Sequence, residues 1–221
     1  VEGNAGNDDL LGNGGSDTIR GQSGQDYLYG HAGSDSLRGG RGADEVEAGP
    51  GTDAVYGGWG ADTVYGADGV DEIMGQQDPD DLHGQGGDDY ISGGGDTDTV
   101  AGGAGNDAIF GGEGDDVLRG NAGDDTIEGG YGPDIVNGGD GADTFVFEQH
   151  HDAMYVEDYD ASEGDTIEVH GWSLNDIQSA QYNPNSQSYE IAFGGPSFQG
   201  TEEIELQGVS TFDVAQDVTF V

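Results

Sequence analysis

The sequence predicts an all-β fold in which the chain winds into a solenoid of about eight stacked coils, followed by a small β-rich cap. Three observations lead to this prediction. A nine-residue unit, Gly-x-x-Gly-x-Asp-x-aliphatic-x, repeats sixteen times from Gly3 to Val146 without an insertion or a deletion. The eighth position of the unit is apolar every time, and its first half is rich in glycine. A fixed short period of this kind is the signature of a coil of stacked turns.

Within each unit, we expect the first half to turn and the last three residues to form a strand. Glycines at the first and fourth positions permit positive φ at no steric cost. In the strand, the eighth side chain points to one side and the seventh and ninth to the other. Two units then complete one coil, so equivalent residues of successive coils stack at roughly 4.8 Å. The coils build two facing parallel sheets with the eighth-position side chains between them.

The sixth position carries the chemical signal, because it is aspartate in all sixteen units. Stacking places these carboxylates in two rows, one along each edge, where bare carboxylates roughly 5 Å apart repel by about 1 kcal/mol even in water. A cation between successive turns reverses that sign. Aspartate also suits turns, but a turn role tolerates Asn, Ser or Gly, and none of them stands at this position. The predicted metal ligands are Asp8, Asp17, Asp26, Asp35, Asp44, Asp53, Asp62, Asp71, Asp80, Asp89, Asp98, Asp107, Asp116, Asp125, Asp134 and Asp143.

Calcium is the cation that these sites fit best. Ca²⁺ takes 6–8 oxygen ligands at ~2.3–2.6 Å and accepts backbone carbonyls beside carboxylates, whereas Mg²⁺ demands a tighter octahedron and keeps its waters. Soft metals would need thiolates, and the chain has no cysteine. Eight turns along each edge leave seven gaps, so the roll offers up to about fourteen calcium sites.

The charge balance limits the possible partners. Asp and Glu number 46 against four Arg and no Lys, for a formal net charge of −42. Nucleic acid and anionic membrane surfaces both need a basic footprint, and no apolar run approaches the ~20 residues of a membrane span. Acidic, glycine-rich chains tend to disorder, and a single file of apolar side chains is a thin core. We therefore expect folding to be coupled to metal binding.

At this point the repeat can be compared with a known pattern. A unit such as Gly102–Phe110, Gly-Gly-Ala-Gly-Asn-Asp-Ala-Ile-Phe, resembles the G-G-x-G-x-D-x-U-x nonapeptide of the RTX (repeats-in-toxin) family. The resemblance implies a parallel β-roll (right-handed β-solenoid) that binds calcium. It also implies a secreted Gram-negative exoprotein that is unfolded at cytosolic calcium and folds in the extracellular space, often after type I secretion. The expected partners are calcium, the type I secretion machinery and an upstream domain, because the chain begins at Val1 and we interpret it as a fragment of a larger protein.

Some units depart from the pattern, and three residues matter most: Ala48, Asp78 and Asp96. The second position is glycine in only eight units, which should matter little if only its carbonyl is used. Ala48 replaces an opening glycine, and Asp78 and Asp96 replace fourth-position glycines. The latter two are either tolerated turn residues, since Asp accepts left-handed geometry, or they form a distorted site of four carboxylates with Asp80 and Asp98. We favour the first interpretation.

After Val146 the repeat stops, so we divide the chain into a roll over residues 1–146 and a capping and secretion-signal region over 147–221. A roll needs a cap over its last coil. Alternating apolar residues predict strands, and Ser-x-x-Asp patterns predict short helices at 173–176 and 210–213. The last five residues resemble the ending of a type I secretion signal, with an edge strand as the alternative. The predicted strands are Met154–Tyr159, Thr166–Val169, Ser188–Phe193, Glu203–Leu206 and Val218–Val221.

No catalytic constellation is recognisable, since both H-E-x-x-H and G-x-S-x-G are missing from the sequence. The segment Glu148–Asp152 holds the one His–acid cluster, which we interpret as a polar loop rather than a metal site. We therefore expect no enzyme activity in this chain, with any catalytic domain upstream. The favoured function is a calcium-folded module, and the alternative is a polysaccharide-binding or adhesion module. For an acidic polymer such a module would use Arg20 and Arg38, which stack on one face but lie within a net charge of −42, and for a neutral glycan it would use Tyr29, Tyr56, Tyr65 or Trp59.

Overall fold

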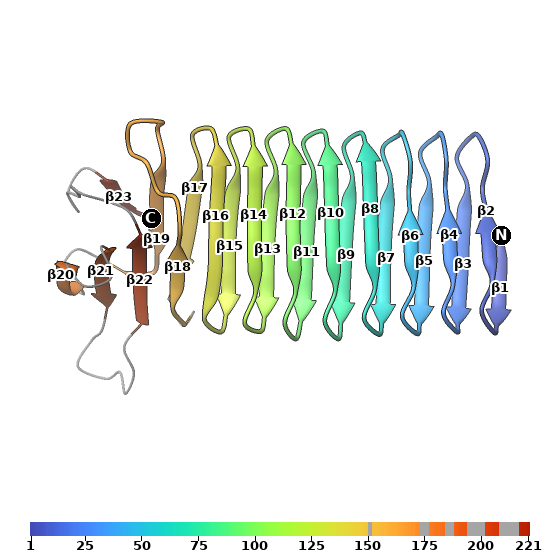
Figure 1. The fold of residues 1–221 in the computed structure, drawn as a ribbon, viewed down its shortest axis with the longest axis horizontal. Helices are drawn as coiled ribbons and strands as arrows, with labels where there is room; N and C mark the ends of the chain where they lie inside the picture. The colour runs from blue at the N-terminus through green and yellow to red at the C-terminus, as the bar shows by residue number, and fades with distance from the viewer. Residues whose placement is uncertain (150–151, 173–176, 184–187, 194–201, 208–216) are drawn as a thin grey trace.

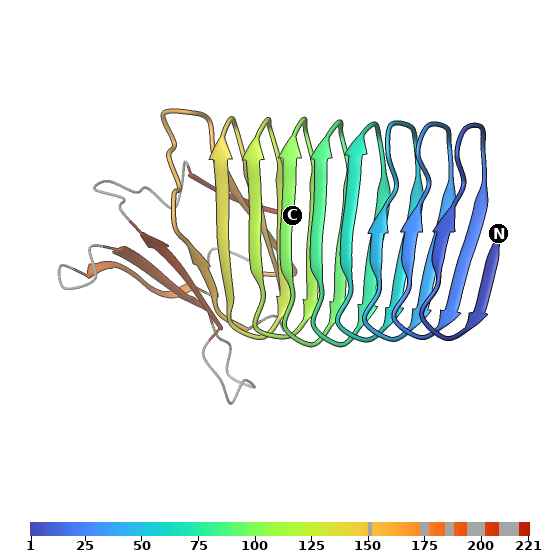
Figure 2. The same cartoon turned by 45° about the vertical axis from the view of Figure 1, so that its right-hand side comes forward.

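The computed structural model describes residues 1–149, 152–172, 177–183, 188–193, 202–207 and 217–221. Over these residues the chain is all-β, with essentially no helix, and winds into a parallel solenoid of about nine turns (Figure 1). The N-terminus lies at one end of the stack and strands β20 to β22 lie at the other (Figures 1 and 2). The predicted fold class is confirmed.

Each coil gives one strand to each of two sheets. The first sheet consists, in order, of β1 (Glu2–Ala5), β3 (Thr18–Ser23), β5 (Ser36–Arg41), β7 (Ala54–Trp59), β9 (Glu72–Gln77), β11 (Tyr90–Gly95), β13 (Ala108–Glu113), β15 (Thr126–Tyr131), β17 (Thr144–Glu148), β19 (Thr166–His170) and β23 (Val218–Phe220). The second consists of β2 (Asp9–Leu11), β4 (Tyr27–Tyr29), β6 (Glu45–Glu47), β8 (Thr63–Asp68), β10 (Asp81–Gly86), β12 (Thr99–Ala104), β14 (Val117–Ala122), β16 (Asp134–Asp140), β18 (Met154–Val156), β22 (Glu202–Gln207), β21 (Ser188–Phe193) and β20 (Ile177–Asn183).

The register within the repeats is 18 residues, as the pairs Ile19↔Leu37 and Leu82↔Val100 illustrate. This register stacks every eighth-position side chain over its equivalents, and all sixteen are buried between the sheets. They form one continuous file: Leu10, Ile19, Leu28, Leu37, Val46, Val55, Val64, Ile73, Leu82, Ile91, Val100, Ile109, Leu118, Ile127, Val136 and Phe145. The predicted core is confirmed.

The strands differ in extent from the expectation. From β7 to β15 each strand has six residues, because it includes the first three positions of the next unit as well as positions seven to nine. The opening glycine is therefore a strand residue, as Gly66 is within β8, and the expected positive φ at that position was wrong. Positive φ occurs instead at the second position of every unit, and at the fourth position in all but Gly51.

The structure also corrects the expectation for the second position, where the backbone has a positive φ whatever the residue is. Ala67 and Gln76, for example, have φ of 86° and 89°. A non-glycine residue in this left-handed region raises the conformational free energy of the folded chain by roughly 1–2 kcal/mol. Half of the units have such a residue at the second position.

Parallel pairing continues beyond the last repeat. Strand β19 pairs with β17, and β18 pairs with β16, so both sheets cross Val146 without a break. Strand β22 continues the second sheet parallel to β18, and β21 and β20 then extend it in antiparallel pairs. All five predicted strands occur, β20 was not predicted, and the predicted helices at 173–176 and 210–213 lie outside the described residues. Across the described ranges, no helix has the length and apolar character to cross a membrane.

Candidate metal centre

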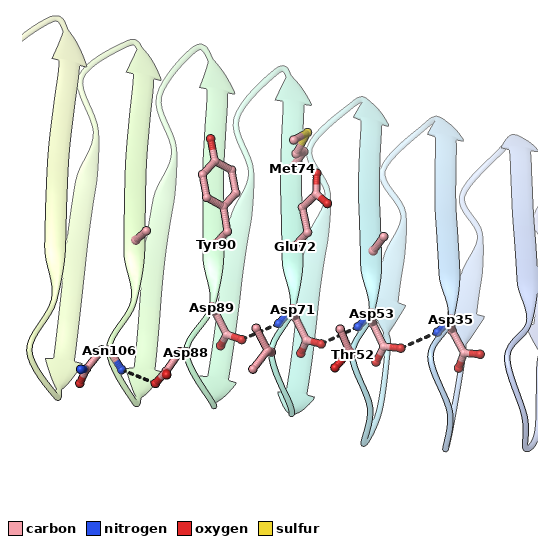
Figure 3. Close-up of a pocket in the computed structure, with 13 residues that line it drawn as sticks. Asp35, Thr52, Asp53, Asp71, Glu72, Met74, Asp88, Asp89, Tyr90 and Asn106 are labelled. Carbon is pink, nitrogen blue, oxygen red and sulfur yellow. Dashed lines mark hydrogen bonds between the residues drawn. The ribbon is translucent and has the colours of Figure 1, made fainter.

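The sixteen sixth-position aspartates form two continuous rows, one along each edge of the roll. In each row the backbone N–H of one aspartate donates a hydrogen bond to Oδ1 of the aspartate in the next coil, at 2.7–3.0 Å. Figure 3 shows this ladder along Asp35, Asp53, Asp71 and Asp89. One oxygen of each carboxylate from Asp26 onward is thereby held in place by the preceding coil, whereas Asp8 and Asp17 begin the two rows.

The other carboxylate oxygen has no such partner. Oδ2 is buried and without a hydrogen bond in fourteen of the sixteen aspartates, with Asp17 and Asp134 as the exceptions. Burying a charge without a partner is costly, so buried charges are normally paired or bound to a metal. The affected residues are Asp8, Asp26, Asp35, Asp44, Asp53, Asp62, Asp71, Asp80, Asp89, Asp98, Asp107, Asp116, Asp125 and Asp143.

A second oxygen points into the same space. A Cβ added to Gly57 would lie 2.6 Å from Asp62 Oδ2 and 2.9 Å from the carbonyl oxygen of Gly75 in the next coil. Gly66 shows the same arrangement with Asp71 Oδ2 and the Gly84 carbonyl, at 2.6 and 2.8 Å. The opening glycine thus leaves space for these oxygens and does not supply a positive φ; Ala48, which is fully buried, is the one residue with a Cβ at this position of the sixteen units. The opening glycine leaves a small cradle lined by carboxylate and carbonyl oxygens, the donor set that suits Ca²⁺.

Burial also changes the acidity of the rows. Desolvation raises the pKa of Asp62 to about 7, that of Asp80 to about 8 and that of Asp98 to about 7. The backbone hydrogen bond to Oδ1 opposes this rise, and the neighbouring carboxylates add to it. Near neutral pH, these carboxyls therefore need either a proton or a cation within the folded roll.

A shorter ladder, at the fifth position, was missed by the sequence analysis. Asp88 Oδ1 accepts a hydrogen bond from the Asn106 N–H at 2.8 Å (Figure 3), Asn106 Oδ1 accepts one from Asp124, and Asp124 Oδ1 accepts one from Ala142. These bonds run in the opposite direction to those of the aspartate rows. The signal was present as Asp and Asn at the fifth position of alternate units.

Past the last repeat, two aspartates have hydrogen bonds on both carboxylate oxygens, and both were missed by the sequence analysis; the first of them, Asp165, continues the row that contains Asp143. Asp165 accepts hydrogen bonds from the N–H groups of Asp143 and Asp160, at 2.9 and 2.7 Å. Asp158 accepts hydrogen bonds from two successive glycines, 138 and 139, at 2.9 and 2.7 Å. Backbone donors therefore occupy the carboxylate oxygens at the end of the stack. The order Asp165-Thr166-Ile167, which repeats positions six to eight of the unit, was the available signal.

The structure supports the simpler interpretation of Asp78 and Asp96. Both have positive φ, at 72° and 75°, and Asp78 Oδ2 accepts a hydrogen bond from the Gly60 N–H at 3.0 Å. Among the described residues, no three His, Cys, Asp or Glu side chains are placed to hold one metal ion. The carboxylates of Asp78, Asp80, Asp96 and Asp98 therefore do not form a metal-binding cluster by themselves. In the His–acid cluster at Glu148–Asp152, Glu148 Oε1 lies 3.6 Å from His170 Nδ1. Residues 150–151 of this cluster lie outside the described part of the chain.

These features define a class of protein: an acidic parallel β-roll whose stacked turns present buried, all-oxygen cation sites. The family model of the RTX calcium-binding nonapeptide repeat matches seven overlapping segments: residues 2–37, 29–64, 38–73, 65–100, 74–109, 92–127 and 119–149. The chain belongs to this family, and its roll is a calcium-binding repeat module.

Two further comparisons add little to this assignment. The solution structure of the AlgE6R3 subunit from the Azotobacter vinelandii mannuronan C5-epimerase is similar, with a TM-score of 0.47 and 27% identity over 57% of this chain and 80% of that one. No curated protein sequence matches the chain.

Proposed function

We propose that this module folds on binding extracellular Ca²⁺ and so serves the secretion, folding and stabilisation of a larger secreted bacterial protein. The observation that carries the proposal is the set of fourteen buried Oδ2 atoms without a partner, thirteen of them beside an opening glycine and that of Asp53 in the unit that opens with Ala48. The sixteen row aspartates are the proposed ligands, together with backbone carbonyls. Two rows with seven gaps each then take up to about fourteen ions.

The bound ions supply positive charge where the roll most lacks it. Fourteen divalent ions would change the formal net charge from −42 to −14, because each adds two positive charges. The N–H ladder holds Oδ1 of each aspartate and turns Oδ2 toward the cradle, so the protein orients the ligands before the ion arrives. Metal affinity then contributes directly to the free energy of folding.

This coupling suits export. At the low calcium of a cytosol the chain stays unfolded, and at the higher calcium outside the cell it folds. In this proposal residues 147–221 cover the last coil and carry the signal for the type I secretion machinery. Any catalytic activity belongs to a domain upstream of Val1, and the working location is extracellular.

The proposal is tested by titrating metal-stripped protein with Ca²⁺ and recording far-UV circular dichroism, while calorimetry counts the ions. We expect a transition from coil to β-structure with about ten or more ions bound, reversed by chelator. Magnesium at the same concentration is the control and should leave the chain largely unfolded. A cooperative thermal melt that persists in excess chelator would contradict the proposal, since the aspartate rows would then not be needed for folding.

A further inference from the structure

The outer face of the first sheet changes its charge along the roll. Strands β3, β5 and β7, with sequences TIRGQS, SLRGGR and AVYGGW, hold three of the four arginines of the chain and no Asp or Glu. Strands β13, β15 and β17, with sequences AIFGGE, TIEGGY and TFVFE, hold three glutamates and no arginine. Strands β9 and β11 lie between the two groups (Figure 1). The face is therefore basic on one side of its centre and acidic on the other.

The strand register arranges the outward side chains of β5 to β15 in straight lines across the sheet, and we call this surface the graded face. All of its side chains are exposed or half-buried. The line at the ninth position of the unit consists of Arg38, Tyr56, Met74, Ser92, Phe110 and Glu128. The line at the seventh position consists of Ser36, Ala54, Glu72, Tyr90, Ala108 and Thr126. The third position adds Arg41, Trp59 and Glu113.

Two arginines on the basic side rest on aromatic rings of the next strand. The Arg38 guanidinium carbon lies 4.6 Å from the centre of the Tyr56 ring, and that of Arg41 lies 5.2 Å from the centre of the Trp59 ring. The register aligns both pairs. Such cation–π contacts limit the freedom of each guanidinium without using its N–H donors. Within the described ranges, neither Arg38 nor Arg41 makes an ion pair or a side-chain hydrogen bond, so both can bind a carboxylate of another molecule.

The ninth-position line is complementary to its own reverse. When the line is read backwards from β15 to β5, Glu128 stands opposite Arg38 and Phe110 stands opposite Tyr56. The first pair joins opposite charges, and the second joins two aromatic rings, which attract each other beyond the area that they bury. A line of this kind fits a second copy of the same surface turned end to end.

The seventh-position line has the same property. Its reverse places Ala108 opposite Ala54, so that two small side chains let the faces approach. It also places Tyr90 opposite Glu72, so that a hydroxyl donor meets a carboxylate acceptor. Tyr90 is 43% exposed and stands beside a hollow of about 740 Å³ that Ala54, Glu72 and Ala108 help to line (Figure 3). A projecting ring next to a hollow supplies both halves of a contact that a second copy completes.

We propose that two copies of this chain pair through the graded face in a symmetric dimer. The two-fold axis runs parallel to the strands and passes between β9 and β11, so that β5 of each copy faces β15 of the other. Two equivalent pairs of Arg38 with Glu128 then flank the aromatic centre. Trp59, which carries the Arg41 guanidinium, faces Glu113 of the other copy. A contact of this kind uses the same surface on both copies and closes at two.

The size and composition of the graded face fit a weak but specific dimer. Its six strands have six residues each, which corresponds to a surface of roughly 30 Å by roughly 20 Å. Two copies then bury on the order of 1,200 Å², at the lower limit of specific interfaces. Tyr, Trp, Phe, Met and Arg are the residue types enriched in such interfaces, and all five occur on this face.

Bound calcium is necessary for the contact, so this inference rests on the proposed function. The graded face exists only in the folded roll. The dimer also brings like edges of two rolls side by side, where fourteen divalent ions change the formal net charge of each copy from −42 to −14. Exposed charges beyond the Debye length of about 8 Å are largely screened at physiological salt. The paired charges on the face therefore outweigh the more distant repulsion.

The test measures the mass of the full chain in saturating calcium by sedimentation equilibrium, at about 0.15 M salt. The parent should pass from monomer to dimer as its concentration rises. R38E and E128R should each weaken self-association by about tenfold or more, because like charges then face each other at two places. R119E makes the same charge change at an exposed residue of β14 in the second sheet. This variant is the matched control and should dimerise as the parent does.

An equimolar mixture of R38E and E128R gives the sharper result. Each chain then brings the charges that the other needs at both places, so a heterodimer should form with nearly the affinity of the parent. Neither variant should dimerise comparably alone. A merely structural effect of either substitution would not be restored by mixing.

Calcium-induced circular dichroism of each sample separates this proposal from the previous one. A parent that folds in calcium and stays monomeric overturns the dimer alone. A chain that remains unfolded in calcium overturns the proposed function and the dimer with it. Equal dimerisation by R38E and the parent would also overturn the dimer, as would a mixture in which the two variants stay monomeric, or growth of the parent into open chains of more than two copies.

Discussion

At the scale of single residues, the two oxygens of a row aspartate have different environments. Oδ1 of Asp116 accepts a hydrogen bond from the Asp98 N–H at 2.8 Å, while its Oδ2 is buried without a partner. The first contact fixes the side chain and the second oxygen faces the cradle. An asparagine could keep the hydrogen bond, but it would lose the charge that attracts the cation.

Asp116→Asn is therefore expected to weaken calcium binding in the gaps on either side of this residue, by about tenfold to a hundredfold. Calorimetry should count fewer ions at saturation, and the calcium midpoint of folding should rise. The neighbouring Asp115 is exposed, so Asp115→Asn makes the same charge change outside the row and should leave both quantities nearly unchanged. Equal effects of the two substitutions would show that net charge, and not the row, sets calcium affinity.

The raised pKa values of the row aspartates predict how the metal-free chain responds to pH. Burial raises the folded pKa of Asp62 to about 7 and that of Asp80 to about 8, above the ordinary value of about 3.9 expected in the unfolded chain. Between these limits the folded state binds more protons than the unfolded state. The stability of the metal-free roll is therefore greatest at low pH and falls as pH rises through the folded pKa values.

Metal-stripped protein should accordingly gain β-structure in far-UV circular dichroism as the pH is lowered from about 8 to about 5. In calcium the sign reverses, because protons compete for the carboxylates and the calcium midpoint should rise over the same range. A metal-free spectrum that does not change with pH would contradict this prediction.

At the scale of the strand and its turn, glycine has separate functions at three positions. The second and fourth positions use positive φ, whereas the opening glycine lies in a strand and leaves room for oxygens. A Cβ at Gly66 would meet Asp71 Oδ2 at 2.6 Å and the Gly84 carbonyl oxygen at 2.8 Å. Both distances are too short, so the cradle would have to open.

Gly66→Ala should therefore lower stability in saturating calcium by about 1–3 kcal/mol and reduce the number of bound ions. Gly95 is the matched control: its φ is not positive, and the nearest atoms to an added Cβ lie 3.8 Å away, so Gly95→Ala should change stability by less than about 0.5 kcal/mol. Thermal melts and calorimetric ion counts measure both effects. If Gly66→Ala bound the full number of ions with the stability of the parent, the cradle would not be the cation site.

At the scale of the whole molecule, the roll is a stack in which each coil contacts only its neighbours. Stability then approximates a sum of coil and interface contributions. A central coil has two neighbours, whereas the first coil, with β1 and β2, has one. Strands β17 to β19 and the hydrogen-bonded Asp158 and Asp165 continue the stack at the other end.

Ile109→Ala, in the fully buried centre of the file, should cost about 2–5 kcal/mol in denaturant unfolding at saturating calcium. Leu10→Ala, at the 7% exposed end of the same file, should cost clearly less, because one side of its coil has no partner. Hydrogen exchange should show the first coil opening before the central ones. Equal losses from both substitutions would indicate that the roll unfolds as one unit.

Much of the molecule could be read from the repeat. An uninterrupted period of nine predicts the coil, the parallel pairing, the file of core side chains and the two aspartate rows, because every turn has the same local chemistry. The strand extents were less accurate. A pattern of residue types does not separate a glycine needed for φ from one needed for space, as Gly66 and Ala67 show.

The amino-acid sequence by itself therefore determines every feature that recurs with the nine-residue period, including calcium as the expected cation. The rest depends on contacts between coils and past the last repeat, where no period exists to guide prediction. The missing partner of Oδ2, the continuation of one row from Asp143 to Asp165, and the pairing of Arg41 with Trp59 all arise between residues 18 or more positions apart. Such contacts are set by register and by the space between stacked backbones, and these exist only once the coils are packed.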